Sequence, residues 1–227
     1  MKAWGSFRHK NLYPFKSSSE GLSPVVGSLL LLLIVFVLAG VIASSINLSE
    51  GGTNFQPPFV KITLESCEGG IYGTGPVSNW ARFEENQIVL MHEGGESLPL
   101  DSISIRISGY GNSFQGNISN GSGKRIEGDV QVLYLDLSQK GKNQGYLKRN
   151  SAVLEDGSWD VGEKLILCGR DSDSGTTYSS VKVRVGGVEK TKDNYGFKAG
   201  SEITLMVIDS EGRNVIAERT AIVKLAE

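Results

Sequence analysis

The chain has 227 residues, of which 23 are basic and 25 acidic, giving a formal net charge of −2. Residues 22–227 alone carry 19 basic and 24 acidic side chains, a net charge of −5. An acidic chain argues against nucleic acid and anionic lipid headgroups as partners, because both bind basic surfaces. The 177 residues from Gly51 to Glu227 suffice for one domain with a well-buried core.

Residues 1–21 form a polar, basic segment that is not expected to fold. Its charged side chains are Lys2, Arg8, Lys10, Lys16 and Glu20. Because basic residues stay on the cytoplasmic side of a membrane, we expect the amino terminus to face inward and the later residues to face outward. Such a segment is typical of a targeting peptide.

An apolar stretch follows, with no charged residue between Glu20 and Glu50. A helix over residues 24–47, at ~1.5 Å rise per residue, would be ~36 Å long and could cross a bilayer with a ~30 Å hydrocarbon core. Ser23 is a favoured N-cap, and Pro24 suits the first helical position because it lacks an N–H. The Gly21–Leu22 peptide bond is then expected to lie extended and accessible just outside the helix.

The order of these parts resembles the N-terminus of the archaeal type IV pilin family. Ser23-Pro24-Val25-Val26-Gly27 is similar to its Ser-Pro-Val-Ile/Val-Gly signature, although the glutamate that many type IV pilins carry at the fifth mature position is replaced by Val26. The resemblance implies that residues 1–21 are a prepilin-type leader (class III signal peptide), cut between Gly21 and Leu22. It also implies that residues 22–50 form a helix that is transmembrane first and filament core later.

Two other interpretations of the apolar stretch remain open. An ordinary secretory signal would be cleaved near Ala43-Ser44-Ser45 and would release a soluble protein. An uncleaved anchor would instead keep an external domain on the membrane. The mature amino terminus distinguishes all three.

A linker is expected at residues 51–58, and period-two alternation, typical of half-buried strands, follows it. The expected strands are 59–64, 102–108, 130–137, 164–168, 180–185, 202–208 and 214–218, with 221–225 continuing the last. Glycine pairs supply turns, and no amphipathic helix is expected beyond residue 50. The sequence thus predicts a long hydrophobic α-helix followed by an all-β, immunoglobulin-like sandwich head over residues 59–227.

Segments of this head also resemble archaeal pilins, more loosely than the N-terminus does. Residues 86–98 are similar to the family's strand followed by His-x-Gly-Gly-Asp/Glu-x-Leu. Residues 159–163 and 197–201 resemble its aromatic-x-x-Gly-polar turns before a strand, and residues 207–210 resemble its closing hairpin.

No catalytic apparatus is evident, so we expect no enzyme activity, cofactor or metal. His92 has no second histidine in a metal-binding pattern and is expected at a strand-to-turn position. No nucleophile elbow or phosphate-binding loop is present. Residues 109–111, Gly-Tyr-Gly, are expected to form a loop. Residues 171–175 alternate oxygen ligands as calcium loops do, but a solvated hairpin tip is favoured because the distal glutamate is missing.

Cys67 and Cys168 are the only cysteines, and both are expected outside the cell. A disulfide between them would close a loop of ~100 residues and stabilise the fold by ~4.7 kcal/mol in the chain-entropy model. The alternative is two separate buried thiols that pack as small apolar groups.

Asn117 and Asn120 begin glycosylation sequons in a polar segment expected to be an exposed loop. A third sequon begins at Asn47, at the helix end, where crowding would hinder a glycan.

The resemblance implies a structural function: a pilin of a type IV pilus-like surface filament that serves adhesion. Its implied partners are other copies of itself, a prepilin peptidase, an assembly ATPase with a membrane platform protein, and the membrane before assembly. The alternative function is a membrane-anchored or secreted β-sandwich binding protein.

Overall fold

The structure is a computed structural model of the whole chain. It describes residues 24–50, 58–73, 80–116, 123–172, 178–188 and 191–227, and within the N-terminal helix it describes the side chains of residues 25–41. The chain divides into two compact units, residues 1–54 and 55–227, which we describe separately.

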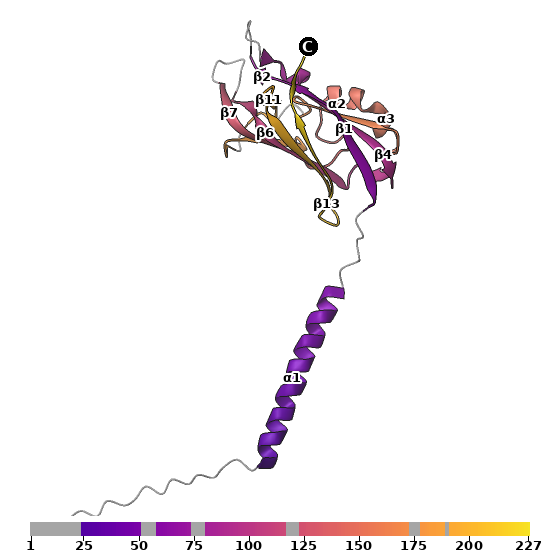
Figure 1. Cartoon of the computed structure of the whole chain (residues 1–227), viewed down its shortest axis with the longest axis vertical. Helices are drawn as coiled ribbons and strands as arrows, with labels where there is room; N and C mark the ends of the chain where they lie inside the picture. Colours follow the sequence, from indigo (N-terminus) through magenta and orange to yellow (C-terminus); the bar gives the residue numbers. More distant parts are fainter. Residues whose placement is uncertain (1–23, 51–57, 74–79, 117–122, 173–177, 189–190) are drawn as a thin grey trace, which may run out of the picture. The chain divides into compact units, whose positions relative to one another are not determined.

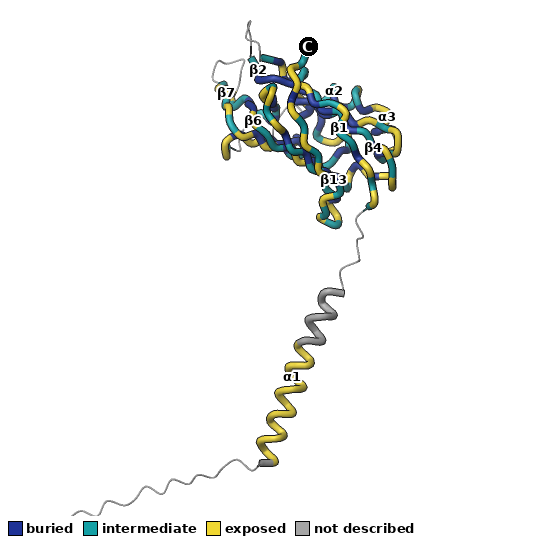
Figure 2. Tube along the Cα trace, in the orientation of Figure 1, coloured by how far each residue is buried: buried dark blue, intermediate teal, exposed yellow. Residues whose placement is uncertain are grey.

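The described part of the first unit is the helix α1 (Pro24–Glu50) (Figure 1). It begins at the expected proline and continues to Glu50, the first charged residue after the apolar stretch. Its described side chains are all exposed (Figure 2). Among the residues that the structure describes, no helix is both long enough and apolar enough to cross a membrane.

The second unit, called the head below, is built from several sheets with mainly antiparallel pairing. A four-stranded sheet has the order β14-β1-β4-β9, in which the β14–β1 pair is parallel. The bounds of its strands are β1 (Val60–Gly69), β4 (Gln87–Gly95), β9 (Lys164–Cys168) and β14 (Lys224–Leu225).

A six-stranded sheet has the order β10-β7-β6-β12-β13, with β11 also paired to β6. The bounds of its strands are β6 (Ile103–Gln115), β7 (Lys124–Tyr134), β10 (Val181–Val185), β11 (Gly196–Phe197), β12 (Glu202–Asp209) and β13 (Asn214–Ile222). Two short pairs complete the set: β2 (Ile71–Tyr72) with β3 (Trp80–Ala81), and β5 (Leu98–Pro99) with β8 (Ser158–Trp159).

The two larger sheets contribute to one hydrophobic core. Alternate residues of the central strands are fully buried, such as Leu90 of β4, Ile105 and Ile107 of β6, and Leu205 of β12. Figure 2 shows this alternation as buried segments between exposed ones. The predicted helix followed by a β-rich head is therefore confirmed, since period-two patterning places every second side chain in the core.

The prediction that residues 109–111 form a loop is wrong, because these residues lie inside β6. A Cβ at Gly111 would stand 1.9 Å from the carbonyl oxygen of Gly196 in β11. Glycine is needed here for close approach of two strands, a requirement that looks like a turn signal in sequence.

The head also contains short helices that the sequence analysis missed. They are a 3₁₀ turn (Phe83–Glu85), α2 (Gln144–Arg149) and α3 (Ser151–Leu154). Asn143 caps α2, where its side-chain oxygen accepts the Tyr146 N–H at 2.9 Å. Helices of four to six residues are too short to show an apolar period.

Candidate functional site

The most distinctive surface of the chain is the side of helix α1, here called the helix surface and defined as residues 25–41. Thirteen large apolar side chains of this segment are at least 41% exposed, ranging from Val26 at 41% to Phe36 at 68%. Successive residues are 100° apart around a helix, so the unbroken run Leu29–Leu38 places apolar groups on every side. The helix surface is thus a complete apolar cylinder and not a single stripe.

Gly27 and Gly40 interrupt this cylinder, and no described residue lies close enough to either to require a glycine. A Cβ at Gly27 or Gly40 would meet nothing within 4 Å. Glycine in a helix interior costs ~1 kcal/mol relative to alanine, and it lets another backbone approach closely. The helix surface can therefore pack against other helices at short distance.

The predicted processing site adjoins this surface. Pro24 begins the helix as expected, and Gly27 lies on its first turns. Gly21, Leu22 and Ser23 lie outside the described residues, so the cleavage site and the cap remain predictions.

Of the two alternatives for the cysteines, the structure has two separate thiols: Cys67 and Cys168 are both free and buried. Cys67 lies opposite Ile88 of β4, and Ile88 lies opposite Leu167 of β9, so β4 separates the two cysteine-bearing strands. Two interstrand spacings of ~4.8 Å put those strands ~9.6 Å apart, beyond the ~7 Å between Cα atoms that a disulfide can span.

Both thiols are buried and have raised pKa values. Burial raises the pKa of Cys67 to about 12 and that of Cys168 to about 11. Cys168 Sγ donates weakly to the carbonyls of Phe83 and Glu84, at 3.6 and 3.4 Å. Because the thiolate is the reactive form, neither cysteine is poised for redox or nucleophilic chemistry.

A buried polar network centred on Asp171 joins α2 to the sheets. One oxygen of Asp171 forms an ion pair with Arg149, and the other accepts from the Tyr134 hydroxyl at 2.9 Å and from the Cys168 N–H at 2.6 Å. Burial raises the pKa of Asp171 to about 6, and Arg149 opposes this effect. The Tyr134 hydroxyl also lies 2.9 Å from that of Tyr195.

This network lacks the features of a catalytic centre. The pKa values of Tyr134 and Tyr195 are raised well above the ordinary value by burial, so both remain protonated donors. Asp171 is 0% exposed, so its carboxylate is closed off from solvent. Its partners come from separate strands and a helix, so no local motif in the sequence could have indicated it.

His92 is buried within β4 and contacts core residues. Its Nε2 lies 3.1 Å from the Glu96 carbonyl, its ring packs edge-on against Trp159 at 5.8 Å, and its Nδ1 has no partner among the described residues. The Glu163 carbonyl accepts both the His92 backbone N–H and the Trp159 indole N–H at 3.1 Å. His92 therefore fixes the turn before β9, which agrees with a structural role.

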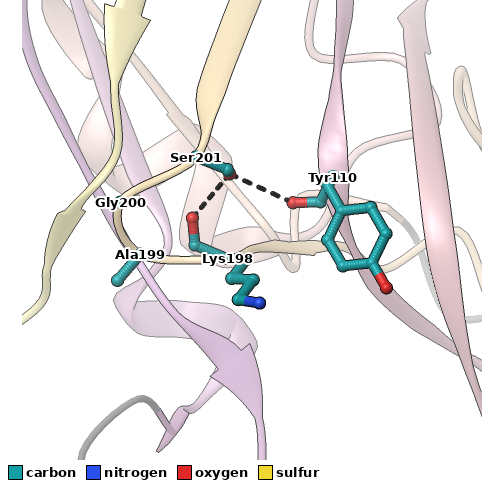
Figure 3. Close-up of a pocket in the computed structure, with 5 residues that line it drawn as sticks. All are labelled: Tyr110, Lys198, Ala199, Gly200 and Ser201. Atoms are coloured by element: carbon teal, nitrogen blue, oxygen red, sulfur yellow. Dashed lines mark hydrogen bonds between the residues drawn. The ribbon is translucent and has the colours of Figure 1, made fainter.

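One pocket, of about 400 Å³, lies on the head where β6 meets the turn before β12 (Figure 3). Its lining residues are Tyr110, Lys198, Ala199, Gly200 and Ser201. The Ser201 hydroxyl lies 2.6 Å from the Lys198 carbonyl and 3.4 Å from that of Tyr110, and Lys198 Nζ lies 5.6 Å from the Tyr110 ring. The Ser201 hydroxyl thus donates to backbone carbonyls, and among the described residues it has no hydrogen bond to a basic side chain.

The remaining candidate positions are the glycosylation sequons and the possible calcium or metal ligands. Asn117, Asn120 and residues 173–175 lie outside the described residues, so the sequons and the calcium-loop alternative remain untested. Within the described ranges, no group of three or more His, Cys, Asp or Glu side chains is arranged to hold a metal ion.

Comparison with known proteins adds no assignment. No protein-family description matches the chain, and no curated protein matches it significantly in sequence.

Proposed function

We propose that the chain is a pilin, the structural subunit of an archaeal type IV pilus-like surface filament. The observation that carries this proposal is the helix surface, which is apolar on every side and directly follows a basic leader. Burying one large apolar side chain contributes ~1.5–3 kcal/mol. Thirteen such side chains would together contribute on the order of 20 kcal/mol, so this helix needs an apolar environment.

In a filament, identical helices supply that environment for one another. Helices with small residues pack closely without requiring a polar partner, and Gly27 and Gly40 provide such positions. The heads would then form the outer surface of the fibre and would serve adhesion.

The proposal also includes a sequence of events before assembly. A prepilin peptidase cuts between Gly21 and Leu22, and an assembly ATPase with a platform protein lifts subunits from the membrane. The membrane stage rests on the sequence of residues 22–50, not on the described part of the helix. Fractionation of the uncut precursor tests it, because the proposal expects precursor in the membrane fraction.

We further propose that the head is an immunoglobulin-like β-sandwich. The order β1-β4-β9 corresponds to strands A-B-E of that fold, and β13-β12-β6-β7 corresponds to G-F-C-C′. One departure is that β10 follows β9 along the chain, whereas the comparable edge strand of variable-type domains precedes strand E.

The first test is the mass of the mature chain from surface material. The pilin interpretation expects residues 22–227, plus any glycan. A start near Ser45 would contradict it and would favour the secreted binding protein, and an intact residue 1 would favour an uncleaved anchor.

The second test introduces a charge into the helix surface. Leu33, 58% exposed, is replaced by aspartate, which costs ~3 kcal/mol in lipid and finds no partner in a dry helix bundle. We expect Leu33→Asp to abolish fibres in sheared surface material, while the matched control Leu33→Met, which conserves volume and polarity, assembles normally. Normal fibres from Leu33→Asp would show that the helix does not form the filament core.

A further inference from the structure

The pocket on the head is formed by a rigid turn beside an exposed aromatic ring (Figure 3). In this turn the Ser201 N–H donates to the Lys198 carbonyl at 3.1 Å, and Gly200 has a φ of 55–90° type, at +81°. A positive φ at the third position of a tight turn favours glycine. The Lys198 N–H donates to the Tyr110 carbonyl and the Gly200 N–H to the Val223 carbonyl, both at 2.8 Å. Backbone hydrogen bonds therefore hold the pocket in shape before any ligand binds.

The pocket leaves one face of an aromatic ring open to a ligand. Among the residues that line it, only Tyr110 carries an aromatic ring, and Tyr110 is 40% exposed. A Cβ at Gly200 would meet nothing within 4 Å, so no described side chain fills the space at the turn. The pocket volume of about 400 Å³ falls within the ~300–1,000 Å³ range of small-molecule sites.

Charged side chains of both signs surround the Tyr110 ring. Exposed Asp129 of β7 lies directly opposite Tyr110, and Lys198 lies on the other side of β6, with its Nζ 5.6 Å from the ring centre. Glu202 follows the turn and points away from the core, because its neighbour Ile203 is buried. Within the described residues, none of the three charged side chains forms an ion pair.

This arrangement selects against charged ligands. The two carboxylates repel an anion, and the ammonium group repels a cation. A ligand with hydroxyl groups is compatible with all three side chains, because a hydroxyl both donates and accepts hydrogen bonds.

We propose that this pocket binds an uncharged saccharide. The C–H groups on one face of a sugar ring pack on the Tyr110 ring, and the hydroxyl groups at its rim accept from Lys198 and donate to Asp129 and Glu202. All of these residues belong to the head, so the inference goes beyond the proposed filament and does not depend on assembly.

The test measures binding of the purified full-length chain to beads that carry neutral oligosaccharides of glucose, galactose or mannose, in a detergent without a sugar headgroup. We expect the unaltered chain to bind at least one of the three, and the same oligosaccharide in free form to release it. Titration with the free oligosaccharide then gives the affinity of each variant.

Tyr110→Ala should weaken binding about tenfold, which corresponds to the loss of ~50 Å² of apolar contact. Tyr110→Phe keeps the ring and should stay within about threefold of the unaltered chain. Lys198→Met, an exposed change that keeps the apolar stem, should weaken binding by about threefold or more, because it removes a hydrogen-bond donor. Tyr178→Ala is the matched control, since Tyr178 is 83% exposed but lies outside this pocket.

Failure of the unaltered chain to bind any of the three oligosaccharides would overturn the saccharide site. Equal losses from Tyr110→Ala and Tyr178→Ala would also overturn it, because binding would then be adsorption to exposed aromatic rings. Stronger binding to oligosaccharides of uronic acids would show that the pocket selects an anion. If Tyr110→Ala lowers the Tm, unchanged binding by Lys198→Met overturns the proposal in its place. These outcomes are the same whether or not the chain forms fibres, so they are separate from the tests of the proposed function.

Discussion

Replacing Asn150 with alanine is expected to destabilise the head, because the Asn150 side chain takes the place of a missing strand at the edge of a sheet. Asn150 stands where β9 lacks a neighbouring strand. Its Nδ2 donates to the Ile166 carbonyl at 2.9 Å, and its Oδ1 accepts the Ile166 N–H at 2.7 Å. The same side chain is 1% exposed and also donates to the Tyr146 carbonyl at 3.2 Å.

The expected magnitude follows from these contacts. Asn150→Ala leaves the N–H and the carbonyl of Ile166 without partners at a covered edge, and each unpaired buried group costs ~1–3 kcal/mol. We therefore expect a loss of ~3 kcal/mol in the free energy of unfolding. For a domain of 150–250 residues this lowers the Tm by ~6–12 °C.

Urea and thermal unfolding of residues 55–227, a compact unit of its own, measure this loss. Asn150→Asp keeps an acceptor for the Ile166 N–H but faces the Ile166 carbonyl with a charge, so it should be at least as unstable. Lys148→Ala, an exposed change on α2, should stay within ~0.5 kcal/mol. If Asn150→Ala behaved like this control, the amide would not be substituting for a strand.

Two further predictions concern the buried ionisable groups. The pKa of Asp171 is raised to about 6 from the ordinary 3.8, so between these pH values the folded head binds a proton that the unfolded chain does not. The free energy of unfolding therefore falls by ~3 kcal/mol as pH rises from about 4 to about 6. Urea unfolding at a series of pH values should show this fall for the unaltered head but not for Asp171→Asn, and parallel stability curves for the two would contradict the shift. Because Cys67 and Cys168 are free and buried, we expect reduction to leave both the gel mobility and the Tm of the head unchanged. Thiol reagents should label the two cysteines only after unfolding. Faster migration without reductant would instead reveal a disulfide.

Alternation in the sequence predicted strands wherever one face is buried and the other wet. In β12, Ile203, Leu205 and Val207 are buried and the residues between them are not, so the pattern defines both the strand and its inner face. Alternation did not predict the strand at residues 109–111, where packing against another strand determines the backbone conformation. Gly111 extends β6 because β11 approaches its Cα, and that contact is made by residues 85 positions later.

The cysteines show a related limit. Cys67 and Cys168 each lie near the end of a predicted strand, and strand ends in one sheet can lie close together. Which strand stands between them depends on the order β1-β4-β9, which no local pattern encodes. The Asp171 network was hidden for the same reason, since Tyr134 and Arg149 reach it from separate elements.

The helix surface poses a different question, because its sequence specifies an environment but no particular neighbour. Every side of it is apolar, and within residues 25–41 there is no charged side chain that could fix register against another helix. In helix bundles a buried polar group commonly sets the register, at some cost in stability. In the proposed filament the helices would therefore supply most of the binding energy, and the heads would have to supply the orientation. A directional contact between charged surfaces of the heads would meet this requirement, since charge pairs discriminate among positions that apolar surfaces treat as equal.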